Sequence, residues 1–114
     1  LFRGRVAGQG LGIGEQQLGG PISSQLAQGS AAIAYVRPHE LEILPADAPG
    51  GISATITRLL PMGPRIRVEL RGDGETRGAH YEAELSKEAA RAFAPGQGVR
   101  LVARHAQLYP DYQI

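Results

Sequence analysis

Apolar and polar residues alternate over short stretches along most of the chain, and this pattern predicts strands. Successive side chains of a strand point to opposite faces of a sheet, so each alternating stretch has one buried and one solvated face. The run 31–36 is more uniformly apolar and too short for a full helix, which favours a buried strand. The other expected strands lie at 2–6, within 15–20, and at 41–43, 52–57, 65–70, 80–85 and 99–103.

Glycine and proline mark the boundaries between these strands. Segments 21–30 and 45–51 read as surface loops, and Gly72-Asp73-Gly74 reads as a hairpin turn in which glycine supplies a positive φ. The alternation breaks at 58–60, which predicts a bulge, and the prolines in 61–64 predict a corner. The tail 109–112 is expected to pack back on the rest of the domain.

One helix is predicted, over residues 86–93. Ser86 is placed to cap its first free N–H groups, and Glu88 lies where the helix dipole favours an anion. Many short strands with one small helix predict an all-β fold, an OB-like β-barrel in which two half-barrels sharing strands are one arrangement. A length of 114 residues indicates a single domain, 1–114, with halves at about 1–44 and 52–114.

Charge and cysteine content exclude several classes of protein. Twelve basic residues, eleven of them arginine, balance eleven acidic ones, so no strong overall field attracts nucleic acid or anionic lipid. The chain has no cysteine, which excludes a disulfide framework and a thiolate nucleophile and fits a reducing cytoplasm. No apolar run is long enough for a membrane span or a signal peptide, and a start at Leu1 rather than Met suggests a piece of a longer polypeptide.

Residues capable of catalysis or metal binding are few and scattered. Lys87, the single lysine, lies outside any G-x-x-x-x-G-K-[ST] loop, so the chain is not expected to bind or hydrolyse ATP. The three histidines lack a metal-ligand spacing. The glycine-rich segment 8–14 lacks the spacing and the following helix of a dinucleotide loop, and its alternate glycines instead suit close backbone approach. Arginines that alternate with glutamates indicate solvated strand faces rather than a nucleic-acid groove.

The segment A-Y-V-R-P-H-E-L-E-I at 34–43 carries a resemblance to a known family. Three further pieces occur in the expected order: F-R-G-R-V at 2–6, M-G-P-R-I-R-V-E-L at 62–70 and R-H-A-Q-L-Y-P at 104–110. Together they resemble the C-terminal TOBE domain, a transport-associated OB fold, of the ATP-binding subunits of bacterial sulfate/thiosulfate ABC importers. The resemblance covers nearly the whole chain.

The resemblance implies a regulatory or dimer-stabilising domain that performs no chemistry itself. The parent subunit would be a transport ATPase, with ATP and Mg²⁺ bound by an N-terminal ATPase domain. The implied partners are that ATPase domain, a second copy of the subunit and the transmembrane permease subunits, with neither nucleic acid nor direct membrane insertion. The implied location is cytoplasmic, peripheral to the inner face of the cell membrane.

Two alternatives remain open from the sequence. The first is an oxyanion-sensing domain, although the Ser-Ala-Arg-Asn-type motif of molybdate-binding relatives is missing. The second is a free-standing OB-type nucleic-acid binder, although the basic aromatic face that such a binder needs is missing. No catalytic, cofactor or metal residue is assigned. Corners and the tail, which either pack on their own barrel or bind a protein partner, supply the candidate interface residues Arg37, His39, Glu40, Met62, Tyr109 and Tyr112. Arg37 either pairs with Glu40 or Glu42 or holds a partner or an oxyanion.

Overall fold

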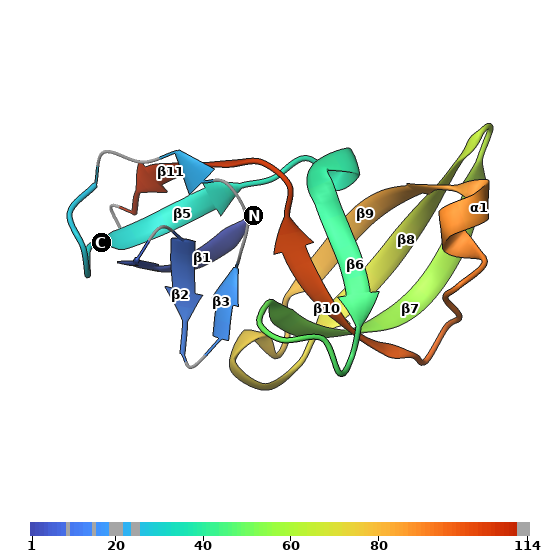
Figure 1. The fold of residues 1–114 in the computed structure, drawn as a ribbon, viewed down its shortest axis with the longest axis horizontal. Coiled ribbons are helices and arrows are strands. Elements are labelled where there is room, and N and C mark those ends of the chain that lie inside the picture. The colour runs from blue at the N-terminus through green and yellow to red at the C-terminus, as the bar shows by residue number, and fades with distance from the viewer. Residues whose placement is uncertain (9, 15, 19–21, 24–25, 112–114) are drawn as a thin grey trace.

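The computed structural model describes residues 1–114 except 9, 15, 19–21, 24–25 and 112–114. Its strands form two sheets arranged along the long axis of the molecule (Figure 1). The six-stranded sheet has the order β3 (Gln16–Leu18), β2 (Gly10–Ile13), β1 (Phe2–Ala7), β5 (Ala31–Tyr35), β11 (Ala106–Pro110) and β4 (Ile22–Ser23). The five-stranded sheet has the order β6 (Leu41–Pro45), β10 (Gly98–Ala103), β7 (Ile52–Met62), β8 (Arg65–Gly72) and β9 (His80–Ser86).

The chain crosses between the sheets twice. After β5 it passes through the 3₁₀ turn η1 (Pro38–Glu40) into β6, and after β10 it returns to form β11. Both sheets therefore contain strands from before and after the 45–51 loop. The division into halves at about 1–44 and 52–114 stays a prediction. Among the described strands, the ladders are antiparallel except the one between β11 and β4.

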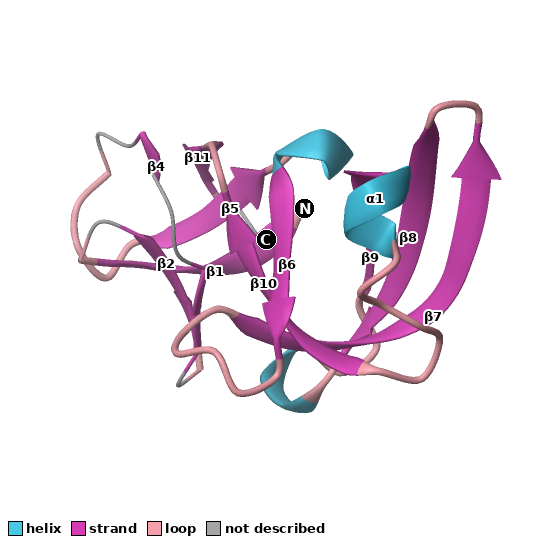
Figure 2. Cartoon of the chain, turned by 45° about the vertical axis from the view of Figure 1, so that its right-hand side comes forward, coloured by secondary structure: helices cyan, strands magenta, loops and turns pink. Residues whose placement is uncertain are grey.

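The predicted all-β, OB-like architecture is confirmed, but among the described strands neither sheet closes into a barrel. Among the described strands the ladders run in linear order in each sheet, and the five-stranded sheet curves strongly, so that its outer strands β6 and β9 approach each other (Figure 2). Within the described part of the chain, no helix is long and apolar enough to cross a membrane.

Alternation along the strands builds the core, as predicted. On β1, Phe2 and Val6 are buried while Arg3 and Arg5 are exposed. The largest side chains with under 2% exposure come from both sheets: Leu11, Leu18, Ile52, Ile56, Leu70, Leu101, Val68 and Val99. The two sheets also meet through aromatic rings, because Phe2 on β1 stacks on Tyr81 of β9 with ring centroids 4.4 Å apart and planes 15° apart.

The predicted bulge and corner in the β7–β8 hairpin are confirmed. The register shifts between Ile56 and Arg58, so one extra residue is accommodated on β7. The strands then join through the two residues Gly63 and Pro64. Gly63 has φ +65°, and since proline cannot take a positive φ at the second position, the turn belongs to the type II′ class, whose twist matches the flanking strands.

The predicted hairpin at Gly72-Asp73-Gly74 is confirmed, since β8 ends at Gly72, Gly74 has φ +59° and β9 returns antiparallel, but the connection is longer than these three residues. It contains the 3₁₀ turn η2 (Gly74–Thr76) and ends where His80 begins β9. Thr76 is the reason, since it is buried and its hydroxyl donates to the carbonyl of Asp73 at 3.1 Å. This hydrogen bond stabilises a wider loop than two residues can form.

Two further expectations need correction. The predicted helix is present, and Ser86 Oγ accepts a hydrogen bond from the Ala89 N–H at 3.1 Å. It is shorter than the expected 86–93, because α1 spans Lys87–Ala90 and the backbone hydrogen bonds that follow it join residues three apart, as in 3₁₀ turns. The 21–30 segment is not only a loop, because β4 pairs with β11. Of the tail 109–112, Tyr109 and Pro110 belong to β11 and so pack on the rest of the domain as expected, whereas residue 112 lies outside the described residues.

Burial of Tyr81 predicts a loss of stability at alkaline pH. Desolvation raises the pKa of the Tyr81 hydroxyl above its usual value of about 10, and a hydrogen bond with Thr76 opposes this in part. The unfolded chain therefore ionises first, so the stabilisation is complete below about pH 10 and is lost as the pH rises through the folded-state pKa. We expect the free energy of unfolding, measured in urea at pH 8 and 10.5, to fall less in Tyr81→Phe than in the native protein. The exposed-residue control Tyr35→Phe should keep the native fall; three parallel curves would contradict the prediction.

Candidate functional site

An open groove of about 550 Å³ lies where the chain crosses between the two sheets. Its walls come from the end of β5, the η1 turn, β11 and the N-terminal residue. The lining residues are Leu1, Tyr35, Val36, Arg37, Pro38, Glu40, His105, Gln107 and Tyr109. The groove thus collects residues from three segments that are far apart in the sequence.

Exposed apolar side chains gather at this groove. In the antiparallel β5–β11 ladder Tyr35 lies opposite Gln107, which places Tyr109 diagonally across on the same face. The two tyrosine rings meet edge to face at 5.4 Å and 78°. Leu1, Tyr35 and Tyr109 are 55%, 53% and 43% exposed, and among the described residues Met62 is the only other large apolar side chain with such exposure. Such a cluster is typical of an interaction surface.

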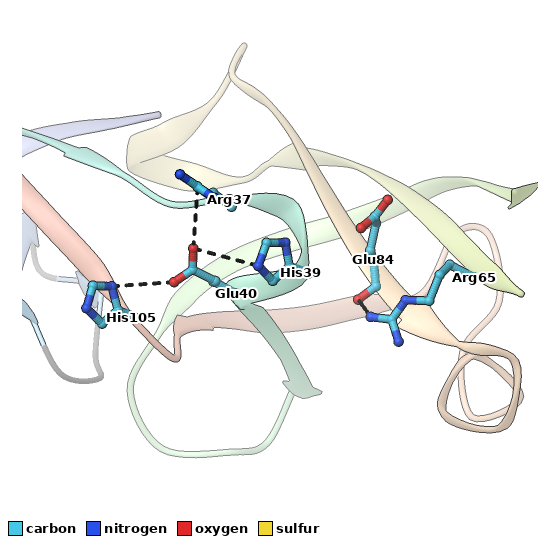
Figure 3. Close-up of polar contacts among 6 residues, drawn as sticks. All are labelled: Arg37, His39, Glu40, Arg65, Glu84 and His105. Atoms are coloured by element: carbon cyan, nitrogen blue, oxygen red, sulfur yellow. Dashed lines mark hydrogen bonds and ion pairs between the residues drawn. The ribbon is translucent and has the colours of Figure 1, made fainter.

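Glu40 stands at the centre of the polar side of the groove, surrounded by three basic groups (Figure 3). Its carboxylate lies 3.4 Å from Nδ1 of His105 and 4.0 Å from both Nε of Arg37 and Nε2 of His39. The backbone adds a firmer contact, since the N–H of Arg104 donates to the Glu40 carbonyl at 2.7 Å. Glu40 therefore joins the two segments by which the chain crosses between the sheets.

The side chains at the groove suit a binding surface. The ion pairs are long and the basic partners are more than half exposed, so each contributes little, about 0–1 kcal/mol. Among the described residues, no set of three or more His, Asp or Glu side chains is arranged to hold a metal ion. Tyrosine and arginine are enriched at protein interfaces and among their hot spots.

The structure brings four of the six candidate interface residues together. Arg37, Glu40 and Tyr109 line the groove, and His39 contacts Glu40 beside it. Met62 is remote, at the tip of the β7–β8 hairpin (Figure 1). The sixth candidate, Tyr112, lies outside the described residues. Whether these residues form an interface stays a prediction.

Sequence reasoning missed Tyr35, His105 and Leu1 as members of the same surface. Tyr35 stands in the 34–43 segment, where the alternation with buried Ala34 was the available signal. His105 had no such signal, because only the pairing of β11 with β5 brings the 104–105 segment beside Glu40.

The arginines of β8 behave mainly as residues of a solvated strand face. Arg67 lies 3.8 Å from Glu82 and 3.9 Å from Glu84, so it pairs with carboxylates of the neighbouring strand β9. Arg65 instead donates to the backbone carbonyl of Glu84 at 3.3 Å (Figure 3). For Arg37 the sequence left open pairing with Glu40 or Glu42 or contact with a partner or an oxyanion; in the structure its Nε lies 4.0 Å from the Glu40 carboxylate.

Comparison with known proteins decides the family. The model described as the TOBE-like domain matches residues 46–104, more than half of the chain. This chain belongs to the TOBE-like domain family. A second model, described as the CysA C-terminal regulatory domain, matches residues 1–43.

Similar full-length proteins are much longer than this TOBE-like chain. The sulfate/thiosulfate import ATP-binding protein CysA 1 of Chromobacterium violaceum is 38% identical over 110 residues, 95% of this chain and 30% of that protein. The protein CysA of Nitrosomonas europaea, with the same description, is 36% identical over 116 residues, 98% of this chain and 32% of that protein. The chain therefore spans about a third of the length of these relatives.

One solved structure supports the fold alone. The cytoplasmic molybdate-binding protein ModG, crystallised with molybdate bound, superposes with a TM-score of 0.59 at 19% identity. The match covers 76% of this chain and 67% of ModG.

Proposed function

We propose that this TOBE-like domain is the C-terminal regulatory and dimer-stabilising domain of the ATP-binding subunit of a sulfate/thiosulfate ABC importer. The observation that carries the proposal is the order of the two family matches, the CysA regulatory model over 1–43 and the TOBE-like model over 46–104. Relatives with this activity in their description align over nearly the whole chain.

In this proposal ATP and Mg²⁺ are bound by the N-terminal part of the parent subunit, which is a transport ATPase. The domain contributes contacts rather than chemistry, and a domain of that kind changes a two-state machine only through contacts that differ between the states. The groove with its exposed Leu1, Tyr35 and Tyr109 supports this role because it offers an uncovered apolar surface between the sheets. Its partners are the subunit's own ATPase domain, a second subunit and the permease subunits, at the cytoplasmic face of the membrane.

Sulfate uptake tests the proposal directly. The native polypeptide that contains this chain is expected to restore ATP-dependent sulfate uptake in a bacterial strain whose own importer ATPase has been deleted. A version cut before Leu1 should retain the ATPase part and lose normal regulation or dimer stability. A native polypeptide without an ATP-binding segment, or one that never restores uptake while expressed and folded, would contradict the proposal.

Substitutions at two separate surfaces locate the regulatory contact. In the full-length subunit, Arg37→Ala and Met62→Ala are made singly and together, because Arg37 lies at the groove and Met62 at the opposite hairpin tip. If either surface carries the coupling, its variant is expected to change ATP hydrolysis or uptake at least about fivefold, the lower range of measured coupling energies. Unchanged dimerisation, hydrolysis and uptake in all three variants, with the fold intact, would show that neither position lies in the interface.

A further inference from the structure

The register of β1 against β5 continues past the first residue of the chain. In this ladder Phe2 lies opposite Ala34 and Arg3 opposite Ile33. One step further places Leu1 opposite Tyr35, and a residue before Leu1 would lie opposite Val36. An antiparallel ladder keeps this register unless a bulge intervenes.

The space on that path is open on both faces. The outward face has the 550 Å³ groove with Tyr35 and Tyr109. The inward face has a second hollow of about 280 Å³, lined by Leu1, Phe2, Val36, Pro38, Leu41, His80, Tyr81 and Glu82. Leu1 borders both hollows, and the N-terminus lies between β1 of one sheet and β10 of the other (Figure 1).

Resting on the proposed function, in which an ATP-binding part precedes this domain, we propose that the residues just before Leu1 extend β1 alongside Val36 and Arg37 and fill the gap between the two sheets. The extension is about two residues long, because Pro38 has no N–H to continue a ladder and the Arg37 carbonyl already accepts from Glu40 at 2.8 Å. The partner of this surface is therefore the domain's own preceding chain.

The alternation of side chains fixes what each preceding residue contacts. The residue before Leu1 shares the face of Phe2, so its side chain enters the hollow beside Tyr81 and Leu41 and should be apolar or small. The residue before that shares the face of Leu1 and covers Tyr35. The ATP-binding part is thereby attached at the junction where Glu40 joins both crossing segments.

Disulfide trapping in the native, longer polypeptide tests this register. A cysteine at the residue before Leu1 is combined with Val36→Cys; the chain described here has no cysteine to interfere, and any cysteine in the preceding part is first replaced. Opposite residues in an antiparallel pair have Cα atoms about 4.5–5.5 Å apart, within the range that a disulfide bridges. Mild oxidation is expected to crosslink most of the protein. The matched control is Ile33→Cys with the same first cysteine, three residues further along β5 and about 10 Å away, which should stay reduced.

Crosslinking at neither position, or equally at both, would overturn the proposal. A native-sequence measurement covers the case in which a cysteine variant fails to fold. Amide hydrogen exchange in segment 35–37 is expected to be about tenfold slower in the longer polypeptide than in the chain that starts at Leu1, an effect of the size of one net hydrogen bond. Equal exchange at all protein concentrations would overturn the proposal, and protection that appears only on dimerisation would assign the groove to a second copy instead.

If the native polypeptide has no ATP-binding part the proposed function fails, whereas failed trapping in a functional importer subunit removes only the strand extension.

Discussion

Phe2→Ala is expected to lower the free energy of unfolding by about 3–5 kcal/mol. Phe2 is 2% exposed and stacks on Tyr81 at 4.4 Å, so truncation removes a buried ring together with the aromatic contact between the two sheets. The cavity left by the truncation cannot collapse easily, because the Phe2 ring packs between strands of different sheets. Urea unfolding at neutral pH measures the effect.

Met62→Ala is the matched control for this change. Met62 is 48% exposed at the tip of the β7–β8 hairpin, so its truncation should alter the free energy of unfolding by no more than about 0.5 kcal/mol. Comparable losses in both variants would show that the sheets are not held together through the Phe2–Tyr81 stack.

Gly72→Ala is expected to destabilise the protein by about 1–3 kcal/mol, at the upper end of that range. A Cβ at this position would collide with the carbonyl oxygen and the hydroxyl of Thr76, which folds beneath the end of β8. Backbone cannot move aside as a flexible side chain does, so the wide β8–β9 connection would have to shift. Thermal unfolding followed by circular dichroism reports the loss.

Gly98→Ala provides the control within the same sheet. Gly98 begins β10, and an added Cβ would meet no atom within 4 Å. We expect its stability to be unchanged or raised by up to about 1 kcal/mol, since alanine restricts the unfolded chain more than glycine does. If Gly72→Ala were as stable as Gly98→Ala, the steric account of the β8–β9 loop would be wrong.

The groove lies where the chain crosses between the two sheets, so a molecule bound there can contact both sheets. The chain crosses between the two sheets twice; Glu40 lies in the first crossing and contacts the second through His105 and through the backbone of Arg104. A ligand, a partner or the preceding chain seated at this place touches both sheets at once. Contacts that join two parts of a protein can differ between conformational states when those parts move relative to each other.

Much of the local structure was determined by the sequence alone. Period-two alternation assigned the buried face of β1 and β8, the broken alternation located the bulge in β7, and Gly63-Pro64 and Ser86 marked a turn and a helix start. These features depend on residues within a few positions of one another, where the backbone preferences of glycine, proline and serine and the pleat of a strand act directly.

Only the tertiary structure decided which strands share a sheet and what meets at the groove. The pairing of β11 with β5 joins residues more than 70 positions apart, and β6 leaves the N-terminal strands to pair with β10. The alternation within a strand does not predict which strand it pairs with, because many apolar faces fit one another equally well. The pairing depends on the packing of the whole core. The same long-range pairing places Tyr109 beside Tyr35 and His105 beside Glu40.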